Sequence, residues 1–265
     1  MDNIKILLTA IPIVIACAVA KLISKRDRLY YHPMDELVDT HLFKQVYNVE
    51  EFDISGVKTW LIPSKNKNKK LILFVHGNAG NITHRQGILS SIASNIDVNI
   101  ACVDYLMLDV VNMKNIHDLF KQVIHFFIRN NYKKEDIIIW GESIGCAIGL
   151  ELCDTLNLNN MVCMCGFRSM KDMSAIVLGK IPTNILFSFI DDYNNKKKLK
   201  HLFNKNKHFN CFIMHSKSDD IIPFEHVDQM CTDLNINLTE IYGMHNKPLI
   251  HSDIYKSIRY KFNLD

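Results

Sequence analysis

The stretch that decides the fold runs from residue 137 to residue 149 and reads IIIWGESIGCAIG. Its first four residues form an apolar run typical of a buried strand, and the residues after Gly145 favour a helix. Between the two stands the pattern G-x-S-x-G, centred on Ser143. Glycines on both sides of the serine permit a sharp, strained strand-to-helix turn that a Cβ atom would obstruct. Ser143 is therefore predicted to be a nucleophile at the carboxyl end of a strand.

From about Phe43 onward, short apolar runs alternate with helical stretches, which predicts a mainly parallel sheet flanked by helices. Strands are expected at 57–62, 71–75, 100–103, 137–140, 161–165, 212–214 and 239–242. Helices are expected at 85–93, 114–129, 144–156, 224–233 and 250–260. The polar turn 63–70 between the first two strands is expected to be a hairpin tip. A chain of 265 residues with 48% hydrophobic residues can build one such domain.

A second motif, HGNAGN, spans residues 76–81 directly after the predicted strand 71–75. Its glycines let the chain turn sharply at the end of the strand. In enzymes with such a loop, the residue after the His-Gly pair and the residue after the nucleophile donate backbone N–H groups to the developing oxyanion. These residues are Asn78 and Ile144 here. His76 is expected to stabilise the loop and not to transfer protons.

Two further motifs supply the remaining groups of a catalytic triad. The segment HSKSDDIIP at 215–223 follows a predicted strand, and Asp219 or Asp220 could reach and orient an imidazole. The segment GMHN at 243–246 places His245 after the last predicted strand, with a glycine two residues before it. The chain order Ser, Asp, His is the one expected for a nucleophile turn of this kind. His245 is therefore the predicted general base, and both carboxylates remain candidates for the acid.

Together the motifs resemble those of the α/β-hydrolases, in particular the membrane-anchored abhydrolase-domain serine hydrolases of eukaryotes that are related to protein depalmitoylases. The matching segments are HGNAGN at 76–81, VDY at 103–105, GESIG at 141–145, DDYNN at 191–195 and GMHN at 243–246. The resemblance covers nearly everything from Tyr30 onward and implies the α/β-hydrolase fold. It also implies Asp219 as the acid, because the family's H-G-x-x-D-E-x-x-P segment aligns with 215–223. The chain departs from the family at Leu106 to Asp109, where an R-G-Y-G turn is usual.

The amino terminus carries a membrane signal. Residues 6–20 are apolar apart from Thr9 and Pro12, and basic residues follow at 21–28. The favoured interpretation is an uncleaved, single-pass anchor with the catalytic domain on the cytoplasmic side, because the excess of basic residues follows the apolar stretch. A cleaved signal peptide and a buried helix are the alternatives. Residues 1–28 are thus predicted to be an anchor with its basic flank, and residues 29–265 the hydrolase domain.

Two other features of the chain have competing interpretations. The apolar segment 174–190 is either part of a short cap, at about 174–195, that lines an acyl pocket or touches a membrane, or an ordinary core helix. The eight cysteines lie mostly inside apolar runs and are expected to be reduced and buried. Cys163 and Cys165 are expected to point to one face of a strand.

These observations predict a serine hydrolase that cleaves an ester or thioester through an acyl-enzyme, on a lipid-like or lipidated substrate at a membrane. Neither a metal nor an organic cofactor is needed for that chemistry. The charge balance of 31 basic against 28 acidic residues does not call for a nucleic-acid partner. The alternative is a catalytically silent protein that uses the same fold to bind a partner.

Overall fold

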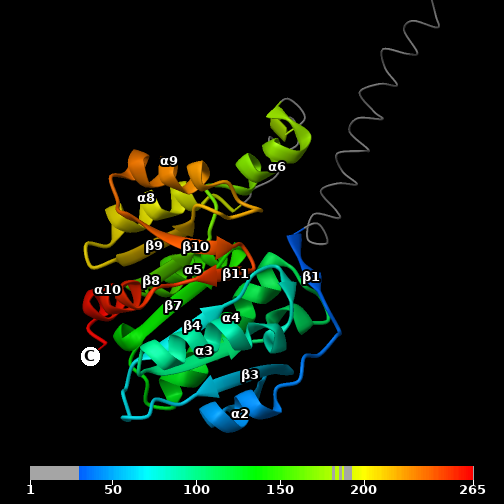
Figure 1. Cartoon of the computed structure of the whole chain (residues 1–265), viewed down its shortest axis with the longest axis vertical. Coiled ribbons are helices and arrows are strands. Elements are labelled where there is room, and N and C mark those ends of the chain that lie inside the picture. Colours follow the sequence, from blue (N-terminus) through cyan, green and yellow to red (C-terminus); the bar gives the residue numbers. More distant parts are fainter. Residues whose placement is uncertain (1–29, 181–182, 185–186, 188–192, 265) are drawn as a thin grey trace, which may run out of the picture.

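A nine-stranded mixed sheet forms the centre of the computed structural model, which describes residues 30–180, 183–184, 187 and 193–264 (Figure 1). The strand order across the sheet is β11-β10-β9-β8-β7-β4-β6-β3-β2. The strands are β2 (Glu50–Ile54), β3 (Val57–Ile62), β4 (Leu71–Val75), β6 (Asn99–Val103), β7 (Ile137–Glu142), β8 (Asn160–Met164), β9 (Asn210–Ser216), β10 (Leu238–Met244) and β11 (Lys247–Leu249). A separate short pair joins β1 (His32–Pro33) to β5 (Ala79–Gly80).

The sheet is parallel through its centre and antiparallel at its edges. Every neighbouring pair from β10 to β6 is parallel, whereas β2–β3, β3–β6 and β10–β11 are antiparallel. All residues of β4, β6 and β7 are buried, because helices cover both faces of the sheet there. That burial explains their continuous apolar runs. The predicted mainly parallel sheet flanked by helices is confirmed.

The helices divide between the two faces of the sheet (Figure 1). Apolar side chains of α4, α5, α8 and α9 belong to one core cluster, and those of α2, α3 and α10 belong to the other. The helices are α2 (His41–Tyr47), α3 (Gln86–Asn95), α4 (Met113–Arg129), α5 (Ile144–Leu156), α6 (Met170–Leu178), α8 (Asn195–Lys205), α9 (Phe224–Leu234) and α10 (Ser252–Phe262). Short 3-10 helices η1, η2 and η3 span Ile82–Arg85, Tyr105–Met107 and Lys134–Asp136.

Two local predictions are wrong. Strand β8 ends at Met164, and Cys165 turns into the left-handed region with φ 50°, so Cys163 and Cys165 pack into opposite core clusters. The turn 63–70 is no hairpin tip, because β6 lies between β4 and β3. The carboxylate of Asp97 fixes this turn by accepting hydrogen bonds from the three residues that follow Pro63, which are Ser64, Lys65 and Asn66.

The seven cysteines in the described part of the chain are free thiols, and six of them are buried.

The predicted anchor, residues 1–28, lies outside the described residues. Among the residues that are described, no helix is both long and apolar enough to cross a membrane. The predicted cap at about 174–195 is described only in part. Its helix α6 begins four residues earlier than expected and lies away from the sheet, to the right of α8 and α9 in Figure 1.

The close packing of α5 on the sheet is open to a test at Gly149. A Cβ atom there would lie 2.7 Å from Ile139 Cγ2 and 2.7 Å from Met161 Cε, so alanine would force the helix away from the sheet. We expect Gly149→Ala to lower the free energy of unfolding by about 1–3 kcal/mol, measured by urea denaturation. The matched control is Gly87→Ala in α3, where a Cβ meets nothing within 4 Å. Equal stabilities of the two variants would contradict the packing described.

Candidate active site

Ser143 stands on a strained turn between β7 and α5. Its backbone has φ 55° and ψ −119°, a conformation that residues other than glycine rarely adopt. A Cβ at Gly145 would lie 2.0 Å from the carbonyl oxygen of Val75, and a Cβ at Gly141 would lie 2.5 Å from that of Gly145. Both glycines are therefore required by the close approach of backbone to backbone. The turn leaves the Ser143 side chain at the carboxyl end of the sheet.

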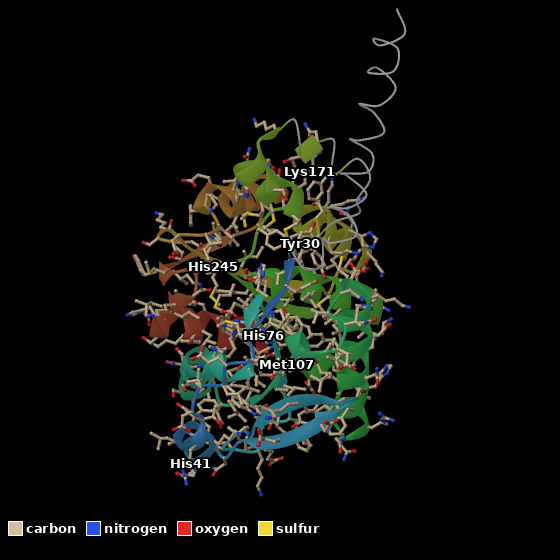
Figure 2. All side chains as sticks on the ribbon, turned by 90° about the vertical axis from the view of Figure 1, so that its right-hand side faces the viewer. Tyr30, His41, His76, Met107, Lys171 and His245 are labelled. Carbon is tan, nitrogen blue, oxygen red and sulfur yellow. The ribbon has the colours of Figure 1, made fainter. Side chains whose placement is uncertain are left out.

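The structure brings Ser143, His245 and Asp219 into one hydrogen-bonded chain. His245 Nε2 lies 3.0 Å from Ser143 Oγ, and His245 Nδ1 lies 2.8 Å from Asp219 Oδ2. The three residues directly follow β7, β9 and β10. Because these strands are parallel, all three residues lie at the carboxyl end of the sheet. His245 lies near the middle of the view in Figure 2, above His76. All three side chains are largely shielded from solvent, with Ser143 only 8% exposed.

The two neighbouring aspartates do different things. The Asp219 side chain is fully buried, and its Oδ1 accepts the backbone N–H groups of Ile221 and Ile222 at 3.0 and 2.8 Å. Burial raises the pKa of Asp219, but the hydrogen bonds from His245 and from these N–H groups outweigh it and hold the pKa below its usual value. Asp220 instead accepts the backbone N–H of His245 at 2.9 Å. Asp219 thus faces the imidazole, and Asp220 fixes the loop that carries it.

A buried histidine and a buried cysteine lie behind Asp219. His215 Nε2 is 3.6 Å from Asp219 Oδ2 and also contacts the carbonyl oxygen of Ile222 at 3.0 Å. Cys165, His215 and Asp219 are close enough together to share a metal ion. The residues do not fit that role well, because burial raises the pKa of the Cys165 thiol and Asp219 Oδ2 already accepts from His245. Within this group, His215 is the residue in contact with the Asp219 carboxylate.

Glu142, inside the GESIG motif, ties the predicted oxyanion loop to the serine turn. Its Oε2 accepts the backbone N–H of Gly77 at 2.9 Å and forms an ion pair of 3.2 Å with Arg85 Nε. Arg85 in turn donates to the carbonyl oxygen of Ala79. The pair therefore holds the loop around Asn78 from two sides. Sequence reasoning missed both residues, although a glutamate in a segment expected to be buried requires a partner.

The first described segment of the chain braces the same loop from outside. The backbone N–H of His32 donates to the carbonyl oxygen of Asn78 at 2.7 Å, where β1 runs parallel to β5. Asn81 Nδ2 donates to the carbonyl oxygens of Met34 and Glu36 at 2.7 and 2.8 Å. These bonds bring Met34 to the wall of the site. The HGNAGN loop is thus held on both sides.

A stacked pair of rings fixes the base of the loop. His76 and Tyr105 are stacked with their centroids 4.3 Å apart, and the Tyr105 hydroxyl donates to the carbonyl oxygens of His76 and Gly77. Burial, and next the charge of Arg85, lower the pKa of His76 to about 3. The imidazole is therefore neutral at physiological pH, in line with the loop-stabilising role predicted for it. Leu106 and Met107, where the resembling family has a glycine turn, belong to the 3-10 helix η2, which buries Leu106.

A cavity of about 300 Å³ opens above Ser143. The cavity is lined by residues 77–80 of the loop and by Met34, His84, Arg85, Glu142, Ser143, His245 and Asn246. Asn78 therefore lies on the wall of this cavity, where the sequence places an oxyanion donor. Ile144, the other predicted donor, is the first residue of α5 and follows Ser143 directly.

Comparison with known proteins identifies the fold. No known protein-family model matches the chain. It is 24% identical over 259 residues to an uncharacterized protein of Acanthamoeba polyphaga mimivirus, covering 88% of this chain and 86% of that protein. It is also similar to the solved structure of Est1E from Butyrivibrio proteoclasticus, with a TM-score of 0.59 and 14% identity, covering 80% of this chain and 96% of that one. The chain has the α/β-hydrolase fold.

A thioesterase domain shares this α/β-hydrolase fold. The domain, from the curacin biosynthetic pathway, has a TM-score of 0.53 and 10% identity, covering 81% of this chain and 98% of that one. At such identities the similarity establishes the fold alone. The relation to protein depalmitoylases stays a prediction.

The buried state of His76 predicts a pH dependence of stability. Its pKa is about 3 in the folded protein and about 6.5 in the unfolded chain, so between these two pH values the unfolded chain binds the proton and the folded protein does not. From pH 7 to pH 5 this group should lower the free energy of unfolding by about 2 kcal/mol. The variant His76→Phe keeps a ring beside Tyr105 but cannot bind a proton. Urea denaturation at both pH values should show a smaller loss in the variant, and equal losses would contradict the assignment.

Proposed function

We propose that the protein is a serine hydrolase that cleaves an ester or a thioester through an acyl-enzyme. The observation that carries this proposal is the hydrogen-bonded chain from Ser143 through His245 to Asp219, with separations of 3.0 and 2.8 Å. A nucleophile in contact with a base that a buried carboxylate orients is the arrangement that nucleophilic catalysis requires. We assign the three residues the roles of nucleophile, general base and orienting acid.

The geometry supports a two-step reaction. Ser143 Oγ attacks the acyl carbon while His245 Nε2 takes its proton, and Asp219 stabilises the imidazolium that results. Backbone N–H groups of Asn78 and Ile144 are the proposed donors to the oxyanion. His245 then gives its proton to the departing alcohol or thiol, and the acyl group remains on Ser143. In the second step His245 activates a water molecule, which releases the acid and restores the serine.

The structural neighbours support the choice of bond. One solved structure of Est1E has ferulic acid bound, a carboxylic acid of the kind that ester hydrolysis releases, and the curacin pathway domain is a thioesterase. The same fold hosts many reactions, so these neighbours favour acyl transfer without naming the substrate. A catalytically silent protein would be favoured by a Ser143 that His245 cannot reach. The 3.0 Å contact gives that alternative no support.

A lipid-like or lipidated substrate at a membrane is the finer part of the proposal. Its support is the apolar segment 6–20 with its basic flank, which we propose to be a single-pass anchor with the domain in the cytoplasm. The described chain then begins at Tyr30, and two residues later β1 contacts the oxyanion loop. Large apolar side chains are exposed near that loop and near His245, among them Met34 and Met244. A membrane close to the carboxyl end of the sheet would cover these side chains.

An activity-based probe tests the nucleophile. The full chain should be labelled by a fluorophosphonate, because the probe reacts with serines that a neighbouring base activates. The variant Ser143→Ala should show no labelling under the same conditions, with circular dichroism confirming that both proteins are folded. Absence of labelling in the folded wild type, or equal labelling of the variant, would refute the proposed nucleophile.

The neighbouring aspartates form a matched pair for a second test. Asp219→Asn should lower kcat/KM for a short acyl ester by about 10⁴-fold, because the amide favours the wrong tautomer of His245. Asp220→Asn should lower it by about tenfold at most, since asparagine keeps an oxygen that accepts the backbone N–H of His245. Steady-state kinetics of both variants measure the difference. Equal losses would mean that the carboxylate next to the imidazole has been assigned wrongly.

A further inference from the structure

A second cavity lies beside the catalytic one. This second cavity has a volume of about 520 Å³ and lies between α3 and the residues of β11. His84, Arg85, Glu142 and Asn246 line both cavities, so the second cavity adjoins the one above Ser143. We call the part between α3 and β11 the α3–β11 groove.

Beyond the shared residues, the α3–β11 groove has apolar walls that are interrupted by Ser91 and by the exposed Lys247. Ile88 lines it from α3, and Pro248, Leu249 and Ile250 line it from the opposite side. Leu249 is 65% exposed, so most of its side chain is in contact with water. Ile88 and Ile250 also pack against the core beneath, which fixes the floor of the groove. These walls leave apolar surface in contact with water until something covers it.

The junction between the two cavities is polar but does not offer a free charge. Arg85 is paired with Glu142 and also donates to the carbonyl oxygen of Ala79, so its charge is compensated within the protein. Such a junction suits the polar ester or thioester group of a substrate that lies at Ser143. The apolar walls beyond it suit a hydrocarbon chain attached to that group.

We propose that the α3–β11 groove binds an unbranched alkyl chain of the substrate while its ester or thioester group lies at Ser143. The assignment rests on the proposed function and names the part of the substrate that this protein recognises. The chain belongs either to the acyl group or to the departing alcohol or thiol, because both are attached to the reacting carbon centre. Burial of each additional methylene in the groove should raise kcat/KM by up to about fourfold.

A substitution at Gly87 can fill the groove without changing the catalytic residues. It is the second residue of α3 and lines the groove, and a Cβ built on it meets nothing within 4 Å. It is absent from the residues with positive φ, so its backbone suits any side chain. Because Gly87 lines the groove and a Cβ there meets no other atom, we expect a large side chain at this position to occupy volume that we assign to the alkyl chain. Neither the triad nor the Arg85–Glu142 pair includes it.

The experiment compares full-length wild type with Gly87→Phe, and with Gly87→Ala as the matched control. Two series of substrates are hydrolysed: p-nitrophenyl esters with acyl groups from acetyl to dodecanoyl, and acetate esters of linear alcohols of matching lengths. For the wild type, kcat/KM should rise with chain length in one series, and that series identifies which side of the substrate occupies the groove. Gly87→Phe should keep the acetyl rate within about twofold and lose the rise, whereas Gly87→Ala should keep both.

The outcomes separate the groove from the catalytic proposal. Normal hydrolysis of p-nitrophenyl acetate together with the same chain-length profile in wild type and Gly87→Phe would overturn the groove assignment alone. An equal loss by Gly87→Phe at every chain length would also overturn it, because that result means a distorted site. If the folded wild type hydrolyses no ester in either series, the proposed function fails, and the groove assignment fails with it.

Discussion

The strained turn at Ser143 is the constraint on which the rest of the structure depends. A serine at φ 55° costs about 1–3 kcal/mol, and such a conformation persists only where the surroundings enforce it. Strand β7 enters the turn from the centre of the sheet, buried on both faces, and α5 leaves it packed against the same sheet. Gly145 lies directly against the backbone of Val75, so β4 and the turn fit only as one unit. The loop after β4 therefore starts beside the serine.

Charge compensation explains how so many polar groups are buried around this turn. Glu142 pairs with Arg85 and accepts the N–H of Gly77, while Asp219 accepts two backbone N–H groups besides the imidazole of His245. A buried charge without such partners would be costly, and each partner also fixes a segment of the site. The negative charge of Asp219 orients His245, whereas that of Glu142 shapes the loop of Asn78. Two carboxylates thus fix different residues in the wall of one cavity.

Sequence alone predicts the parts of this site that local patterns encode. The run before Gly141 is a buried strand, the glycines around Ser143 mark the turn, and the position after the last predicted strand identifies His245. The choice of Asp219 over Asp220 comes from the family resemblance. What the sequence does not reveal depends on contacts between distant residues. The pairing of Arg85 with Glu142, the bracing of Asn78 by His32 and the groove beside Gly87 join segments that no local pattern connects. The turn at Cys165 could not be predicted from the sequence. One residue in the left-handed region turns its side chain to the other face of the sheet, and the amino-acid composition of the strand does not reveal it.

The measurement that tests the central claim most directly is the mass of the enzyme during turnover. The full chain is mixed with p-nitrophenyl acetate, quenched in acid within milliseconds, digested and analysed by mass spectrometry. The account predicts a burst of p-nitrophenol and an acetyl group on the peptide that contains Ser143, because the acyl-enzyme forms at that oxygen. Turnover without a covalent adduct, or an adduct on another residue, would contradict it. Either result would mean that the strained turn serves a purpose other than nucleophilic attack.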